Sequence, residues 1–388
     1  MDDQFTCNDG TCIQMYNRCD GIYDCVDDSD EKDCNKIIFD ENTYKNEIPP
    51  LERGKSIDIK TSIFLLNINK IELPTTFEAK IRLLLTWKDY RLDFANLQAK
   101  GNIIEEEVQT KLWTPPIRFA NTKHGVLLND EETTMEIIQV GTFVANDIND
   151  LHEANIFKGN ENELNYSREY QENFHCSFDL HYYPFDSQTC TITIDIPDSF
   201  KGQMKLIPTQ TSNAGVKDLD QFLITGIELK SYENDTVIKC LIHMKRNPNY
   251  HIFSTYMPTS CILLMAMITL FIDQSHFEAT IMVTLTSMLV MYTLFQSKAT
   301  SMPSTAYLKL LDYWFCFGLV MPFVAFMVEV IWELMAEKKN SVASGMYGKK
   351  FKENKSPPCH FCKFLLPLIS GVFISCYIIV VIKVINSP

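Results

Sequence analysis

The sequence predicts a multidomain chain that combines a small disulfide-bonded module, an extracellular antiparallel β-sandwich and a four-helix transmembrane bundle. Three observations support this fold class. Five cysteines and ten acidic residues lie within residues 1–34, short runs of alternating apolar and polar residues fill 36–256, and four long apolar segments occupy the last third. A chain of 388 residues is long enough for several domains. We expect their boundaries at 1–35, 36–256 and 257–388.

The four apolar segments are each long enough to cross a membrane as a helix, and they lie at 252–272, 277–296, 307–332 and 364–385. The loop before the last segment, at about 335–362, and its edges carry seven lysines against Glu337 and Glu353. This positive charge places the loop in the cytoplasm. Three crossings then put the N-terminal part outside the cell, where disulfides persist. We therefore expect a multi-pass plasma-membrane protein with an extracellular N-terminal domain.

The composition and motifs exclude several function classes. The formal net charge of −14 argues against a nucleic-acid partner. The sequence has no glycine-rich phosphate loop, nucleophile elbow or zinc-binding helix motif, so we expect no enzyme. The acidic N-terminal segment leaves a binding role open, in which it captures a basic partner and the apolar helices only anchor the chain.

Residues 1–34 contain too few apolar side chains for a core and need disulfides or a metal to hold one shape. Carboxylates are the hard oxygen ligands that Ca²⁺ prefers, and four of them are close in sequence: Asp20, Asp24, Asp30 and Glu31. The cysteine and acid pattern C-D-G-x-x-D-C-x-D-x-S-D-E-x-x-C closely resembles the LDL receptor class A module. This resemblance implies Ca²⁺ binding by those four side chains and by the backbone carbonyls of Asn17 and Ile22. It also implies the disulfides Cys7–Cys25 and Cys19–Cys34. The usual partner of Cys12 is absent, so we expect Cys12 to be free or paired elsewhere, unless the natural chain continues upstream.

Period-two alternation predicts strands in the second domain, for example at 56–60, 77–83 and 190–196. The polar stretch 146–173 is predicted to be a surface excursion from the sandwich. Two sequons predict glycosylation at Asn165 and Asn234.

The most specific signal in the second domain is a loop between two cysteines. Cys176 and Cys190 enclose 13 residues, and a disulfide closing such a loop stabilises by roughly 3 kcal/mol in the chain-entropy model. Four apolar segments follow it, and the sequences WKDYRL at 87–92 and WTP at 113–115, with Lys245-Arg246 before the first span, add to the pattern. Together these features resemble the Cys-loop receptors, the pentameric ligand-gated ion channels. An ordinary sandwich disulfide is the alternative, but it leaves the four spans unexplained.

The resemblance implies five identical or related subunits around one pore, with ligand bound between adjacent sandwiches. It also implies a coupling region in which the tip of the cysteine loop meets the linker between the second and third spans. The residues expected there are Lys70, Ile71, Tyr183, Pro184, Phe185, Asp186, Arg246 and Pro303.

The ligand site departs from the family pattern. Amine receptors bind a cation on aromatic faces, but the matching positions here hold Arg82, Ala120 and Pro197, and only Tyr232 remains on the hairpin before Cys240. We therefore do not expect a quaternary amine agonist. Protons, calcium or a small anionic ligand held by Arg82 are the alternatives.

The segment 277–297 is predicted to line the pore. A mostly polar set of residues recurs there at spacings of three and four, which places it on one helical face: Glu278, Met282, Thr286, Leu289, Thr293, Gln296 and Thr300. A ring of Glu278 carboxylates would favour permeant cations, and Leu289 would close the pore by dewetting. Anion-selective relatives carry Pro-Ala and then Arg at this position, whereas this chain has Glu278-Ala279-Thr280. Met282 forms either a second constriction or a contact with neighbouring helices, and an anion-selective channel is the alternative function.

Overall fold

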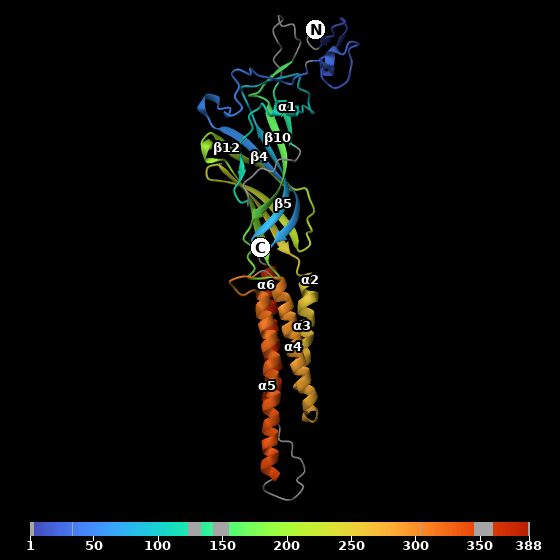
Figure 1. Ribbon diagram of the computed structural model, residues 1–388, viewed down its shortest axis with the longest axis vertical. Coiled ribbons are helices and arrows are strands. Elements are labelled where there is room, and N and C mark those ends of the chain that lie inside the picture. The colour runs from blue at the N-terminus through green and yellow to red at the C-terminus, as the bar shows by residue number, and fades with distance from the viewer. Residues whose placement is uncertain are drawn as a thin grey trace. The chain divides into compact units, whose positions relative to one another are not determined.

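The computed structural model describes residues 4–32, 34–122, 133–142, 155–302, 304–344 and 360–386 (Figure 1). Contacts divide the chain into two compact units. The first contains Met1–Cys176, Thr189–Lys217 and Thr225–His243, and the second contains Ser177–Gln188, Asp218–Ile224 and Met244–Pro388. The end of the cysteine loop therefore belongs to the same unit as the transmembrane helices.

The N-terminal module has little regular structure. It contains strands β1 (Gln4–Thr6) and β2 (Cys12–Gln14), paired antiparallel, and single turns of 3-10 helix at Met15–Asn17 and Ser29–Glu31. The disulfides Cys7–Cys25 and Cys19–Cys34 are present, as predicted, and Cys12 is free and exposed. Its apolar core consists of Phe5, Met15 and the first disulfide, with Ile13 packed against it.

The predicted β-sandwich is confirmed, and it is built on two main sheets. The first has the order β12 (Met204–Asn213), β4 (Ile57–Glu72), β5 (Thr76–Trp87), β10 (Glu163–His175) and β8 (Thr133–Ile138). The second has the order β13 (Phe222–Tyr232), β14 (Val237–Arg246), β11 (Ser187–Asp195) and β7 (Arg118–Phe119). A small sheet joins β3 (Ile37–Ile38), β6 (Asp93–Ala95) and β9 (Ile156–Lys158). The pair β12–β4 is parallel, which the prediction did not include.

Alternation along β5 shows why the sequence folds this way. Its inward residues Phe77, Ala79, Ile81, Leu83 and Leu85 are fully buried, while the residues between them, mostly polar, face outward. Such a strand buries one face only, as expected of an antiparallel sheet. The disulfide Cys176–Cys190 and short helices at Glu52–Gly54, Glu106–Gln109 and Asp198–Phe200 complete the sandwich.

The prediction of a surface excursion over 146–173 is wrong for its second half, and its first residues lie outside the described part of the chain. Residues 163–175 form β10, which pairs with both β5 and β8. Leu164, Tyr170 and Phe174 supply its buried apolar side chains. One face of the sheet is open to solvent, so the residues of β10 on that face are polar. These polar residues led to the wrong prediction of a loop.

The second unit contains the helices. They are α2 (Asn249–His251), a π-helical turn (Ile252–Tyr256), α3 (Met257–Thr269), a 3-10 turn (Gln274–His276), α4 (Phe277–Ser301), α5 (Leu310–Ser344) and α6 (His360–Ile385). Among the described residues, four spans are long and apolar enough to cross a membrane: Asn249–Thr269, Phe277–Thr300, Leu310–Met335 and Phe364–Ile385. Helices α3, α4 and α5 contact one another, and α6 packs on α5. The bundle core lies around Leu263, Met267 and Met321.

Candidate functional site

A buried ion pair lies at the start of the helical unit. The Arg246 guanidinium donates from Nε to Asp186 Oδ1 at 2.7 Å and from Nη2 to Oδ2 at 3.2 Å, and the Arg246 amide donates to the Asp186 carbonyl at 3.1 Å. The two side chains are 0% and 2% exposed. Strand β14 ends at Arg246, so the strand's last residue joins the tip of the cysteine loop to the helical unit.

Other side chains satisfy the remaining polar atoms of this pair. Gln188 Nε2 donates to Asp186 Oδ2 at 2.5 Å, and Arg246 Nη1 donates to Gln221 Oε1 at 3.0 Å. The guanidinium also stacks over the rings of Phe222 at 4.2 Å and Tyr183 at 4.7 Å. Burial raises the pKa of the Tyr183 hydroxyl, which keeps that ring neutral beside the guanidinium. A buried charge pair this well hydrogen-bonded is geometrically fixed.

The tip of the cysteine loop also contacts the segment before α5. The Leu180 amide donates to Tyr307 Oη at 2.9 Å, the Leu310 amide donates to the His181 carbonyl at 2.8 Å, and the His181 and Tyr307 rings stack at 3.8 Å. Tyr183 Oη lies 3.2 Å from His251 Nε2 on α2, and Phe185 packs on Tyr256.

The structure thus brings together five of the predicted coupling residues, Tyr183, Pro184, Phe185, Asp186 and Arg246, all of them buried. Lys70 and Ile71 end strand β4 in the other unit, where Lys70 pairs with Glu72. Pro303 lies outside the described residues. Sequence reasoning missed Gln188, Gln221 and Tyr307, whose roles depend on long-range partners.

The α4 helix has two distinct faces. Its buried residues are Thr280, Thr284, Ser287 and Met291. The seven residues predicted to line a pore are all exposed in the single chain, including Met282 at 62% and Leu289 at 63%. At 3.6 residues per turn the two sets lie on opposite sides of the helix. The side chain of Met282 is therefore not packed against the other described helices of its own chain. The prediction that Met282 contacts neighbouring helices is wrong for helices within the same chain.

Three threonines on the exposed face of α4 direct their hydroxyl hydrogens to the helix backbone. Thr286, Thr293 and Thr300 donate to carbonyls three or four residues earlier, at 2.8 to 3.0 Å. Each hydroxyl has a single hydrogen, so its oxygen presents lone pairs outward. Lys298 is the basic residue in the last turn of α4 and lies on the same helical face as the buried residues Ser287 and Met291. Its Nζ lies 3.3 Å from Ser254 Oγ. Glu278 is thus the charged residue of the exposed face.

Arg82 lines a hollow of about 470 Å³ on the outer face of the five-stranded sheet. Phe64 and Leu84 supply apolar walls, while Glu136 and Ser167 supply polar ones. Arg82 Nε and Nη2 donate to the same oxygen of Glu169, at 3.1 and 2.6 Å. Hydrogen bonds from Lys80 and then Arg82 lower the pKa of Glu169, so this partner stays ionised. The Nη1 group of Arg82 has no acceptor among the described residues and remains available.

The other predicted ligand residues lie on the second sheet and do not line this hollow. Ala120 follows β7, Pro197 follows β11, and Tyr232 ends β13. Lys239 Nζ of the same chain lies over the Tyr232 ring at 4.9 Å, so a face that would attract a cation is already taken. Arg118 nearby on β7 is held by Asp195 through bonds of 2.8 to 2.9 Å.

The asparagines of the two sequons differ in their exposure to solvent. Asn165 is 6% exposed, its Nδ2 donates to Glu136 Oε1 at 2.7 Å, and its Oδ1 accepts from Thr86 at 3.1 Å. Asn165 also lines the hollow that contains Arg82, so glycosylation at this position stays a prediction. Asn234 lies exposed in the turn between β13 and β14.

The acidic residues of the N-terminal module organise its second loop. Glu31 Oε1 accepts from the amides of Asp20 and Gly21, Asp20 Oδ1 accepts from the Ile22 amide, and Asp30 Oδ2 accepts from the Asp24 amide at 2.6 Å. Asp30 is fully buried, and its Oδ1 has no hydrogen-bond partner among the described residues. A buried ionised oxygen without a partner is costly, and a bound Ca²⁺ would satisfy it. The unpartnered Asp30 oxygen thus supports an ion here, although no three of Asp20, Asp24, Asp30 and Glu31 have ligand atoms within 4.8 Å of one another in the structure.

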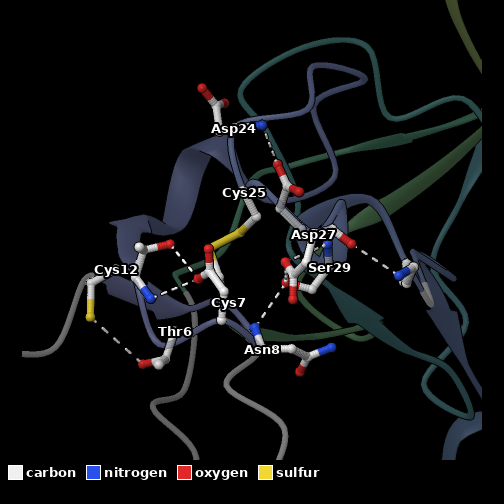
Figure 2. The surroundings of a disulfide bond; sticks show 12 residues. Thr6, Cys7, Asn8, Cys12, Asp24, Cys25, Asp27 and Ser29 are labelled. Atoms are coloured by element: carbon white, nitrogen blue, oxygen red, sulfur yellow. Dashed lines mark hydrogen bonds between the residues drawn. A yellow bond between two sulfur atoms is a disulfide. The ribbon is translucent and has the colours of Figure 1, made fainter.

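A second group in the module does not fit a metal. Cys7, Cys25 and Asp27 have ligand atoms within 4.8 Å of one another. Figure 2 shows that the two sulfurs form a disulfide, and that Asp27 accepts from Ser29, whose Oγ accepts from the Asn8 amide. A disulfide offers no thiolate for a metal.

We expect Asp186→Ala to destabilise the protein by about 3–5 kcal/mol, because it leaves the Arg246 charge buried without a partner. The matched control is Asp195→Ala, which releases the half-exposed Arg118 to solvent and should cost at most about 1 kcal/mol. Thermal unfolding of the detergent-solubilised full chain measures both. Equal losses in the two variants would contradict the role assigned to burial.

Comparisons with known proteins agree with this arrangement. The family model for the neurotransmitter-gated ion-channel ligand binding domain matches residues 32–257, and the model for the low-density lipoprotein receptor domain class A matches residues 1–34. A gamma-aminobutyric acid receptor subunit beta-like protein of Drosophila melanogaster is 27% identical over 272 residues, which cover 66% of this chain and 51% of that protein. A gamma-aminobutyric acid receptor subunit beta of Lymnaea stagnalis is 24% identical over 302 residues, which cover 73% and 57%.

The chain spans about half the length of these curated relatives. The match to the ligand-binding domain nevertheless covers more than half of this chain and includes the disulfide loop, both sandwich sheets and the start of the first span. The chain therefore belongs to the neurotransmitter-gated ion-channel family and carries a low-density lipoprotein receptor class A module at its N-terminal end.

Proposed function

We propose that this chain is a subunit of a pentameric ligand-gated channel in the plasma membrane and that its pore conducts cations. The observation that carries the proposal is the division of α4 into two faces. Its buried face packs within the chain, and its exposed face holds Glu278, three threonine hydroxyls and Leu289. A lone subunit would expose this polar stripe to lipid, which is unfavourable. Five copies around a water-filled axis would instead turn it toward water.

The chemistry of the stripe favours cations over anions. Glu278 contributes negative charge, and the outward lone pairs of Thr286, Thr293 and Thr300 present the negative ends of their dipoles. Lys298 points to the other side of the helix and does not cancel this charge. Rings of acidic and carbonyl-like oxygens attract permeant cations and repel anions. Leu289 interrupts the stripe with an apolar ring that closes the pore by excluding water.

We propose that the Asp186–Arg246 pair holds the cysteine loop in one packing, and that agonist binding shifts the pore between two states through this loop. The loop contacts both the segment before α5 and the start of the first span. An element that touches two helices is suited to switching between discrete packings.

The hollow around Arg82 supports a small ligand with a carboxylate. Free guanidinium N–H groups bind a carboxylate strongly, and 470 Å³ is within the range for small-molecule sites. The relatives are named for γ-aminobutyric acid, which carries a carboxylate at one end. The aromatic ring that could bind the amine end of such a ligand is Tyr232, and the Lys239 ammonium of the same chain already lies over one face of that ring. We therefore propose a small carboxylate agonist that needs no aromatic cage.

The module's carboxylates would hold one Ca²⁺, with Asp30 as the buried ligand and Asp20, Asp24 and Glu31 around it. The carbonyls of Asn17 and Ile22 complete the proposed set. The ion would fix the loop 20–31, which has almost no apolar core of its own.

The pore proposal predicts the outcome of one substitution. In a Leu289→Ser background, expected to wet the gate and conduct without agonist, Glu278→Gln should move the reversal potential in diluted NaCl away from the Na⁺ equilibrium potential. The loss of the carboxylate ring is the reason. Whole-cell recording measures it, and Glu228→Gln on the exposed sandwich surface is the control. A reversal potential at the Cl⁻ equilibrium potential before mutation would establish an anion channel instead, and no current would refute a homomeric channel.

The ligand proposal predicts that Arg82→Lys raises the half-activating concentration of carboxylate agonists about 10- to 100-fold, because lysine keeps the charge but cannot bind Glu169 and present a free Nη1 group at the same time. A panel of small carboxylates, γ-aminobutyric acid included, identifies the agonist on the unmodified channel first. Arg118→Lys is the matched control and should leave the response unchanged. Equal shifts in both variants, or activation only by amines without a carboxylate, would count against the proposal.

For the module, Asp30→Asn should reduce the number of Ca²⁺ ions bound per chain by one, as measured by calorimetry on the full chain. Asp27→Asn makes the same change beside Ser29 and should leave the number unchanged. Undiminished binding in Asp30→Asn would refute the assigned ligand.

A further inference from the structure

We propose that the helical unit binds one small divalent metal cation in a pocket between α3, α4 and α5, with the Glu329 carboxylate as its main ligand. The pocket lies where α3 ends and α4 begins. The lining residues that matter for binding are Thr269, Asp273, Thr280, Glu329, Trp332 and Glu333. This site is separate from the module's carboxylates and from the exposed face of α4.

Glu329 lies within the apolar span Leu310–Met335, six residues before its end, and is 6% exposed. Its Oε2 accepts a hydrogen bond from Thr284 Oγ1 at 3.3 Å, while Oε1 is buried and has no hydrogen-bond partner among the described residues. An acid within a membrane-spanning helix is costly and is retained only when something compensates its charge. No protein group described here does so at Oε1.

In the structure, the hydroxyls of the two nearby threonines are directed to backbone carbonyls rather than to Oε1. Thr269 Oγ1 donates to the Ala266 carbonyl and Thr280 Oγ1 donates to the Phe277 carbonyl, each at 2.8 Å. Because a hydroxyl has one hydrogen, both oxygens offer only lone pairs to the pocket. Carboxylate and hydroxyl oxygens without donors among them form the type of surrounding that a hard cation requires.

Charge and size indicate which cation fits. Asp273 is exposed and Glu333 is half-exposed, so two carboxylates flank the mouth above the buried one. No lysine, arginine or histidine is among the described residues that line the pocket. Three negative groups favour a divalent over a monovalent ion. The cavity of about 20 Å³ admits one water-sized occupant, which excludes an organic amine.

The carboxylate oxygens of the pocket do not form a group within 4.8 Å of one another. A single ion therefore cannot touch all three acids in this arrangement. We assign Asp273 and Glu333 the role of attracting the ion at the mouth, and Glu329 the role of binding it.

Terbium luminescence tests this site, because Tb³⁺ substitutes for hard divalent ions and Trp332 lines the pocket as an energy donor. The experiment uses the full chain in detergent, in an Asp30→Asn background that removes the module's site. We expect tryptophan-sensitised Tb³⁺ emission that Ca²⁺ displaces and K⁺ does not. Glu329→Gln should abolish it, whereas Glu52→Gln on the sandwich surface should not.

A second variant covers the case in which Glu329→Gln fails to fold. Trp332→Phe keeps all three acids and should lose the sensitised emission while retaining the binding step seen by calorimetry. Emission that survives Glu329→Gln in a monodisperse protein would place the ion elsewhere and overturn the proposal. Displacement by K⁺ at equal concentration would overturn the divalent assignment, and absence of emission in the parent chain would indicate that Glu329 is neutralised by a proton instead.

Discussion

The buried pair of Asp186 and Arg246 is the interaction on which the helical unit depends. Removing two charges from water costs several kcal/mol per ion, and hydrogen bonds to every side-chain nitrogen and oxygen of the pair offset that cost. Gln188, Gln221 and the aromatic faces of Tyr183 and Phe222 provide those partners. The ion pair thereby ties Arg246, which precedes the first membrane-spanning helix, to the tip of the cysteine loop. Any movement of that tip that keeps the pair intact also moves Arg246.

The same principle, that polar groups inside a membrane must be compensated, explains the arrangement of α4. Thr280, Thr284 and Ser287 face the other helices of the chain, where short polar side chains allow close packing. The opposite face carries a carboxylate, hydroxyls and an amide, and it is exposed in the part of the chain that the structure describes. The proposed assembly around a pore would compensate this exposed face, whereas Glu329 on the interior side of α5 would still need a partner that assembly along α4 does not supply.

Much of the fold was predictable because the responsible signals are local. The spacing of Cys176 and Cys190 indicated one disulfide, and the resemblance to the LDL receptor class A module implied the other two. Alternation indicated β4, β5 and β11, and hydropathy with a three-to-four spacing separated the faces of α4. The β10 strand was misread because its open face is polar and its buried residues are widely spaced. Long-range relationships were not predictable. The pairing of Lys239 with Tyr232, the burial of Asn165 and the unpartnered oxygen of Glu329 depend on which strands and helices become neighbours, and no spacing along the chain encodes that.

The Arg82 hollow and the Tyr232 hairpin lie on different sheets of one sandwich. If the proposed ring of subunits forms with neighbouring sandwiches in contact through these two sheets, each interface would combine the Arg82 side of one chain with the Tyr232 side of the next. Under that proposal, ligand specificity would depend on the order of neighbouring subunits rather than on one polypeptide. If this chain assembles with a related subunit, the two orders of contact create two chemically different sites from the same two genes, and subunit arrangement becomes a means of changing pharmacology without changing sequence.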